Sequence, residues 1–266
     1  MLPYLLFSLL FLGLSAASFR HRHRLQQSLR VIAGTEVARL GDLRALVDHV
    51  AVEIGQGAYQ ERVALRGAVH CGAPLTAPLS QQDCVYYKTR ITERYKARRT
   101  IRDRDGNRRQ EWRNGSSVLS TDEVRSPFYL QDPSDRVRVE PEGFEIEGTV
   151  VVEQFEPVSG TDSHPASLKA ELTPRHERDY RTLGYHYREE ILALDTPVYI
   201  LGNLSDADGL AVRSGVEPPG LITHRSQQAV IDRKQKAIRQ ATGLSAVLLA
   251  LSLGMLAYGL YQVLTL

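Results

Sequence analysis

Seven basic side chains lie within fourteen residues of one predicted hairpin, and they form the part of the sequence best suited to binding. They are Lys96, Arg98, Arg99, Arg102, Arg104, Arg108 and Arg109. A cation close to an anionic bilayer contributes on the order of 1 kcal/mol to membrane binding. The cluster therefore predicts a contact with lipid or with a protein partner. The alternative is a solvated hairpin whose charges keep an edge strand from aggregating.

The sequence contains two cysteines, Cys71 and Cys84. We expect buried or partly buried thiols of a β-rich core, because free cysteine is among the most buried residue types. A disulfide between them is a second possibility in an oxidising compartment. A nucleophilic cysteine would need a lowered pKa, and the neighbouring Lys88 and Arg90 are weak reasons to expect one.

Catalytic and metal-binding motifs are missing from the sequence. The eight histidines are scattered without HxxxH or HExxH spacing, and no P-loop, dinucleotide or GxSxG motif occurs. Glu189 and Glu190 are adjacent, so they do not converge as a general acid–base pair must, and we interpret them as a surface acidic pair. We predict no catalytic residue, no metal, no cofactor and no small-molecule substrate.

The elements that must position these side chains are mainly strands. Short β-type runs separated by Gly, Pro, Asn and Asp occur at 62–69, 84–95, 111–120, 127–130, 136–140, 148–153 and 197–202. They predict an α+β, mostly β fold, with a compact barrel- or sandwich-like domain over residues 62–222. A long hairpin is expected to turn at 105–107. Residues 156–183 are polar and indicate a loop.

Apolar segments flank this domain at both ends. Residues 1–19 and 240–266 contain no Asp, Glu, Lys or Arg, and a membrane-spanning helix needs about 20 apolar residues. They predict a transmembrane helix or signal anchor at 1–19 and a transmembrane helix at 240–266. A cleaved signal peptide is the alternative for the first. Helical juxtamembrane segments are expected at 20–61, with an amphipathic helix starting near Gly41–Asp42, and at 223–239.

Both basic flanks of the two spans face the middle of the chain. Arg20, Arg22 and Arg24 follow the first span, and Arg233 and Lys234 precede the second. The positive-inside rule therefore predicts two spans, a central domain on the cytoplasmic side and both termini across the membrane. The net charge of +2 and the scarcity of aromatics among the cations argue against nucleic acid as a partner.

An ordered set of short motifs carries a family resemblance. The motifs are Gly67–Val69, then Cys84, Val85, Tyr86 and Tyr87, then residues 127–132, then 183–192 with Gly184 and Glu189, and finally 198–202 ending in Gly202. Together they resemble the GIDE-type, or beside-a-membrane, domain of membrane-anchored RING-type ubiquitin ligases of mitochondrial and plastid outer membranes. The resemblance implies ubiquitin-protein transferase activity, a role in organelle organisation, and a domain in the intermembrane space.

The resemblance also implies a RING, in which cysteines and a histidine hold two zinc ions after the second membrane helix. The sequence as given has two cysteines in total and so lacks that ligand set. We therefore expect a membrane-anchored, non-catalytic module that binds lipid or an unknown protein partner at the membrane surface. The alternative is ubiquitin transfer together with a separate RING partner, and whether the chain is an enzyme stays open here.

Overall fold

The computed structural model describes residues 2–102, 108–158, 176–177, 179–215 and 218–264. The helices are α1 (Leu2–Gly34), α2 (Leu40–Glu53) and α3 (Gln227–Leu264). The longer strands are β2 (Gln60–His70), β4 (Asp83–Arg102), β5 (Arg108–Arg125), β9 (Thr149–Pro157), β11 (Tyr180–Ala193) and β12 (Pro197–Ser205). The shorter strands are β1 (Val37–Ala38), β3 (Leu75–Thr76), β6 (Phe128–Gln131), β7 (Arg136–Val139), β8 (Glu145–Glu147), β10 (His176–Glu177), β13 (Ala211–Arg213) and β14 (Leu221–Thr223).

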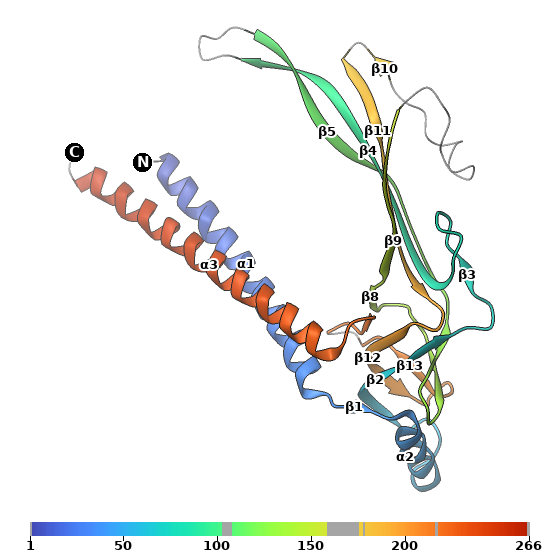
Figure 1. The fold of residues 1–266 in the computed structure, drawn as a ribbon. Coiled ribbons are helices and arrows are strands. Elements are labelled where there is room, and N and C mark those ends of the chain that lie inside the picture. Colours follow the sequence, from blue (N-terminus) through green and yellow to red (C-terminus); the bar gives the residue numbers. More distant parts are fainter. Residues whose placement is uncertain (1, 103–107, 159–175, 178, 216–217, 265–266) are drawn as a thin grey trace.

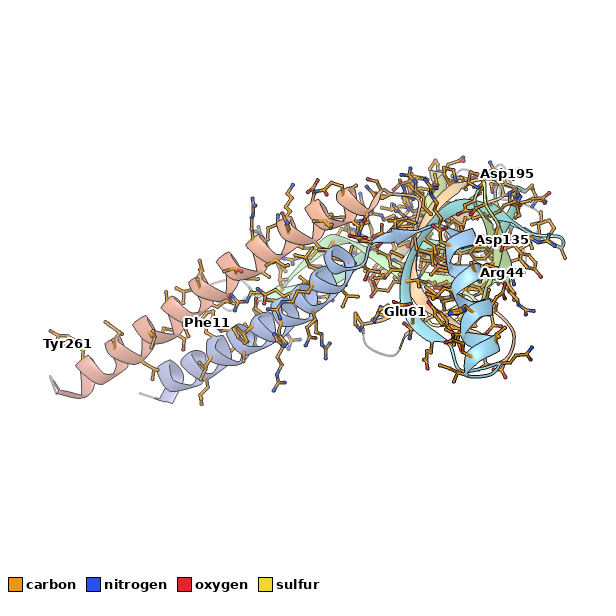
Figure 2. All side chains as sticks on the ribbon, turned by 90° about the horizontal axis from the view of Figure 1, so that it is seen from below. Phe11, Arg44, Glu61, Asp135, Asp195 and Tyr261 are labelled. Carbon is orange, nitrogen blue, oxygen red and sulfur yellow. The ribbon has the colours of Figure 1, made fainter. Side chains whose placement is uncertain are left out.

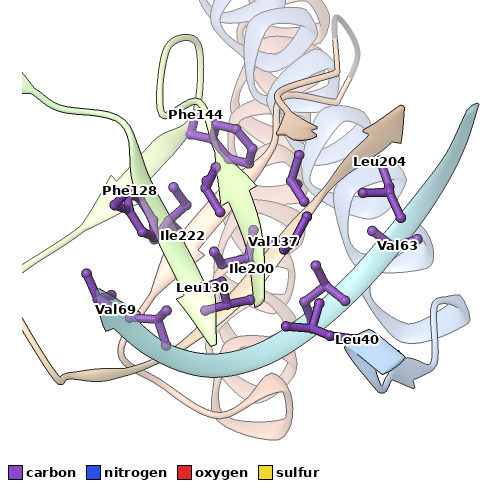
Figure 3. Packing of buried hydrophobic residues seen from close by; sticks show 14 of the residues in the cluster. Leu40, Val63, Val69, Phe128, Leu130, Val137, Phe144, Ile200, Leu204 and Ile222 are labelled. Carbon is purple, nitrogen blue, oxygen red and sulfur yellow. The ribbon is translucent and has the colours of Figure 1, made fainter. Parts of the chain in front are cut away.

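Five strands close into a barrel in the order β2-β6-β7-β13-β12 and back to β2. The pair β7–β13 is parallel, and the other four pairs are antiparallel. Numbered along the chain, the barrel strands follow the order 1-2-3-5-4, which is the Greek-key order of an OB-type barrel. Side chains that point inward from these strands fill the core (Figure 3), among them the fully buried Leu65, Leu130 and Ile200. The barrel form of the prediction is confirmed.

A second sheet leaves the barrel as a long projection, which we call the arm (Figure 1). Its strand order is β5-β4-β11-β9, and β4 and β5 are 20 and 18 residues long. The predicted long hairpin is therefore confirmed, although its predicted turn at 105–107 lies outside the described residues. The predicted β-rich region therefore consists of the barrel and the arm, because strands of this length extend well beyond a five-stranded barrel.

The predicted loop at 156–183 is a strand at both of its described ends. β9 continues to Pro157, and β11 begins at Tyr180 and pairs with both β9 and β4. The alternation of apolar and polar residues that predicts a strand is weak there. One face of the arm is open to solvent, so β9 and β11 carry many polar side chains. Residues 159–175 and 178 lie outside the described part of the chain.

Helices α1 and α3 lie side by side and antiparallel, with both chain ends far from the barrel (Figures 1 and 2). The Ser15 hydroxyl donates to the Ser245 carbonyl oxygen at 3.4 Å, and Ser18 donates to Ala241 at 3.3 Å. Within the described residues, one helix is apolar and long enough to cross a membrane, namely 227–258 of α3, whose most apolar stretch has a mean hydropathy of 1.8 and is 6% buried. A second span in α1 remains a prediction.

The short helix α2 covers the barrel with Leu40, Leu43 and Val47. It begins two residues before the predicted Asp42. The Asp132 carboxylate, 92 residues away in the sequence, accepts the Leu40 backbone N–H at 2.8 Å and so pairs one of the N–H groups that have no partner within the helix. At the other end of the domain, residues 221–223 pair with β12 as β14. The helical segment predicted from residue 223 therefore starts at Gln227.

Candidate functional site: the basic face of the arm

The arm has one covered face and one open face. Residues paired directly across a ladder share a face, so the odd-numbered residues of β4 from Thr89 share one face and the even-numbered residues from Lys88 share the other. On the odd-numbered, covered face, Ile91, Tyr185 and Tyr187 form a buried cluster with Leu79 from the segment before β4. The sequence correctly predicted which residues of β4 share a face.

Glu189 lies on the covered face and is completely buried. Its carboxylate accepts the backbone N–H groups of Leu79 and Ser80, each at 2.8 Å, and the Thr89 hydroxyl at 3.1 Å. The prediction of a surface acidic pair is therefore wrong for Glu189, because the segment around residue 79 folds back over β11. Glu190 points to the opposite face, as the alternation predicted.

The outer part of the covered face is also well packed. Glu93, 6% exposed, accepts hydroxyl hydrogen bonds from Tyr180 at 2.9 Å and Thr182 at 2.6 Å. The Tyr95 ring stacks on Tyr180 with centroids 4.7 Å apart, and it also lies over Gly115. These contacts stiffen the arm and leave the other face open for a partner.

The open face carries a row of cations, and we call it the basic face. β4 contributes six of them, at positions 88, 90, 94, 96, 98 and 102, and β11 adds Arg181 and Arg188. Alternate residues of a strand lie about 6.6 Å apart, so the row is nearly continuous. Its paired acidic residues, at positions 123, 153 and 190, lie at the barrel end. Further out, Asp179 approaches Arg98 at 3.7 Å from beside the strands.

Exposed apolar side chains accompany these cations on the neighbouring strands. Trp112 of β5 is 44% exposed and lies opposite Arg98, whose guanidinium carbon is 5.2 Å from the ring centroid. Phe155 of β9 and Val118 of β5 are exposed at the two edges of the same face. The amphipathic Trp112 ring and the long cationic side chains around it suit a boundary between water and an apolar phase.

The structure divides the cations that the sequence singled out. Lys96, Arg98, Arg102 and Arg108 lie on the basic face, whereas Arg99 and Arg109 lie on the covered side. Arg104 lies outside the described residues. The sequence reasoning missed the five basic-face cations at positions 88, 90, 94, 181 and 188. The spacing of two residues between cations from 88 to 102 was the signal that could have found those on β4.

Both cysteines are free thiols. Cys84 is fully buried at the start of β4, and this burial raises the pKa of its thiol to about 11. The prediction of a core thiol is confirmed for Cys84. Cys71 is partly exposed and lies 3.6 Å from the Pro127 carbonyl oxygen. In the described part of the chain, no group of three or more His, Cys, Asp or Glu side chains is arranged to hold a metal ion.

The motif residues mostly have packing roles. Cys84, Val85 and Tyr86 are buried where the arm enters the barrel. Gly184 has no room for a Cβ, which would clash with the backbone of the neighbouring β9. At Gly202 a Cβ would lie 2.7 Å from the Val212 side chain in the barrel.

A family model named GIDE and described as an E3 ubiquitin ligase matches residues 98–257, which is more than half of the chain. The chain belongs to the GIDE family. The matched residues run from the outer part of β4 through the arm and barrel into α3, so they include three of the sequence motifs quoted above. The motifs at 67–69 and 84–87 precede the GIDE match. No curated protein and no solved structure matches the chain.

Proposed function

We propose that this GIDE-family chain is a membrane-anchored, non-catalytic interaction module whose basic face contacts anionic lipid headgroups. In this proposal, α3 enters the bilayer, the barrel sits at the membrane surface, and the arm lies against the headgroups. Ubiquitin transfer then depends on a separate RING protein that supplies the platform for the conjugating enzyme.

The observation that carries the proposal is the common direction of the arm and the helices. From the barrel, the arm and the α1–α3 pair extend toward the same side of the molecule (Figure 1). A bilayer that holds α3 is therefore on the side to which the arm points. Electrostatic attraction to a charged surface falls off within a Debye length, about 8 Å in physiological salt. The arm must therefore come this close to the headgroups for its cations to bind them.

The anchor includes α1 as a second span in this proposal. The antiparallel pairing of α1 with α3 keeps both chain ends on the same side, as two consecutive spans require. The basic residues that follow the apolar part of α1 and precede that of α3 lie toward the barrel. By the positive-inside rule, the barrel and the arm face the cytoplasm.

The sole tryptophan of the chain allows a direct experiment, since Trp112 lies on the basic face. The full chain is placed in nanodiscs of phosphatidylcholine with or without phosphatidylserine, and the Trp112 emission is recorded. We expect a blue shift with phosphatidylserine that high salt reverses, because salt screens exposed charges. Identical emission in both nanodiscs would contradict the proposal.

A matched pair of variants separates the two faces of the arm. Arg94→Glu/Lys96→Glu reverses two charges on the basic face and should remove the lipid-dependent shift. Arg99→Glu/Arg109→Glu makes the same change of charge on the covered side, and this variant should retain most of the lipid-dependent shift in Trp112 emission. An equal loss in both variants would show that net charge, and not the basic face, governs the contact.

Ubiquitin transfer is tested separately with purified chain, activating enzyme, conjugating enzyme and ubiquitin. The family description favours a role in this reaction. We expect no conjugates without an added RING protein and conjugates on a bound substrate when one is present. Conjugates formed by the chain in the absence of a RING protein would overturn its non-catalytic assignment.

A further inference from the structure

A cavity of about 240 Å³ opens where the basic face meets the barrel. It is lined by Tyr86, Lys88, Arg90, Ile146, Arg188 and Glu190. The Tyr86 side chain is 2% exposed and belongs to the barrel core, so the cavity has a fixed wall. A cavity of this size has room for several water molecules or for a small polar ligand.

Two arginines face each other in this cavity. Arg90 of β4 and Arg188 of β11 are directly paired across the antiparallel ladder, so both side chains leave the same face. Like charges in this relationship destabilise a sheet. An anion between the two guanidinium groups would offset their repulsion.

The charged side chains around the cavity differ in their ion pairs. Arg188 binds Glu190 at 2.8 Å and Glu153 at 3.2 Å, and Lys88 binds Glu123 at 2.7 Å. These bonds raise the pKa of Arg188, chiefly through Glu190, and lower the pKa of Glu123, chiefly through Lys88. Across all the residues that the structure describes, Arg90 has no ion-pair partner, and its side chain is exposed.

We propose that this cavity binds a phosphate group, held by the Arg90 guanidinium with Lys88 and Arg188 beside it. A guanidinium presents a planar fork of donors that matches phosphate oxygens in a bidentate geometry. The phosphate belongs to a soluble phosphate ester or to the headgroup of a lipid. The lipid case rests on the proposed function, which places the basic face at the membrane, whereas the soluble case does not.

The first test uses the full chain in detergent micelles, with its thermal midpoint measured in sodium phosphate and in sodium chloride of equal ionic strength. Phosphate should raise the midpoint, because a ligand of the folded state stabilises it. Arg90→Met should raise the midpoint in chloride, since it removes the repulsion with Arg188, and should weaken phosphate binding at least about tenfold. A variant that is more stable without phosphate but binds phosphate more weakly is the result that this site predicts.

Arg99→Met is the matched control. Arg99 lies on the same strand but on the covered side, where its partner across the β5 ladder is Glu111. This variant should have the phosphate response of the native chain. An equal loss of the phosphate response in both variants would overturn the proposal. So would a native chain that neither responds to inorganic phosphate nor prefers phosphatidic acid in the lipid test below.

The source of the phosphate is tested in nanodiscs that contain phosphatidic acid or phosphatidylserine at equal surface charge. A higher thermal midpoint in phosphatidic acid that Arg90→Met removes identifies a lipid headgroup. A response to inorganic phosphate without this preference identifies a soluble ester. If the cavity does not bind phosphate but the basic face still contacts lipid, the Trp112 emission shift with phosphatidylserine persists in the native chain and in Arg90→Met alike.

Discussion

The backbone N–H of Ser80 donates to the fully buried carboxylate of Glu189 at 2.8 Å, across 109 residues of sequence. With the parallel bond from Leu79, this contact fixes the segment before β4 against one face of the arm. The barrel end of that face is thereby closed to partners. The opposite face, with its row of cations and exposed apolar side chains, is left for binding.

Glu189→Gln should destabilise the chain by about 2–3 kcal/mol, because it replaces a charged acceptor of three hydrogen bonds by a neutral amide in a buried site. The measurement is the free energy of unfolding of the full chain in detergent. Glu190→Gln is the matched control, since Glu190 is partly exposed and its ion pair contributes little. Equal stability of the two variants would contradict the structural role of Glu189.

Gly115→Ala should destabilise the arm by about 1–3 kcal/mol through overpacking. An added Cβ would lie 2.5 Å from the Tyr95 ring, so the stack of Tyr95 on Tyr180 would have to shift. Gly72→Ala makes the same chemical change where no atom lies within 4 Å of the added group. Thermal unfolding should therefore separate the two variants, and equal midpoints would show that Tyr95 yields without cost.

The two thiols should differ sharply in reactivity. At pH 8, a maleimide should modify Cys71 within minutes and leave Cys84 unmodified in the native chain. The thiolate is the reactive form, and a pKa of about 11 keeps the Cys84 thiolate scarce at pH 8, in addition to its complete burial. Mass spectrometry should count one adduct in the native chain and two after denaturation. Rapid native labelling of Cys84 would contradict its place in the core.

The pairing of α1 with α3 predicts a specific cross-link. Ser15→Cys/Ser245→Cys should form a disulfide under mild oxidation in membranes, because the Ser15 hydroxyl reaches the Ser245 carbonyl oxygen in the native pair. Ser15→Cys/Leu253→Cys places the second cysteine two turns further along α3 and should remain reduced. Cross-linking in the second variant alone would show a different helix pairing and would remove the support for two adjacent spans.

The local part of this structure could be predicted from the sequence. The alternation in β4 identified the residues that share a face, and the apolar segment at 240–266 identified the apolar part of α3, which is the candidate membrane span among the described residues. Closure of the barrel was not predictable, because it depends on β2 pairing with β12, more than 100 residues away in the sequence. The burial of Glu189 also depends on a distant segment, so local polarity indicated a surface residue.

The candidate site was predicted only in part for a similar reason. Clustering along the sequence grouped Arg99 with Lys96 and Arg98, although neighbouring residues in a strand point to opposite faces. The cations of β11 joined the site only through pairing with β4. The basic face therefore belongs to the sheet as a whole.

The proposed position of the arm against a bilayer is tested most directly by quenching of Trp112. Nanodiscs that contain phosphatidylserine are prepared with lipids brominated either near the glycerol end or at the far end of the acyl chain. We expect strong quenching by the first, weaker quenching by the second, and loss of both in Arg94→Glu/Lys96→Glu. Trp112 emission that neither brominated lipid quenches would contradict the membrane contact of the basic face.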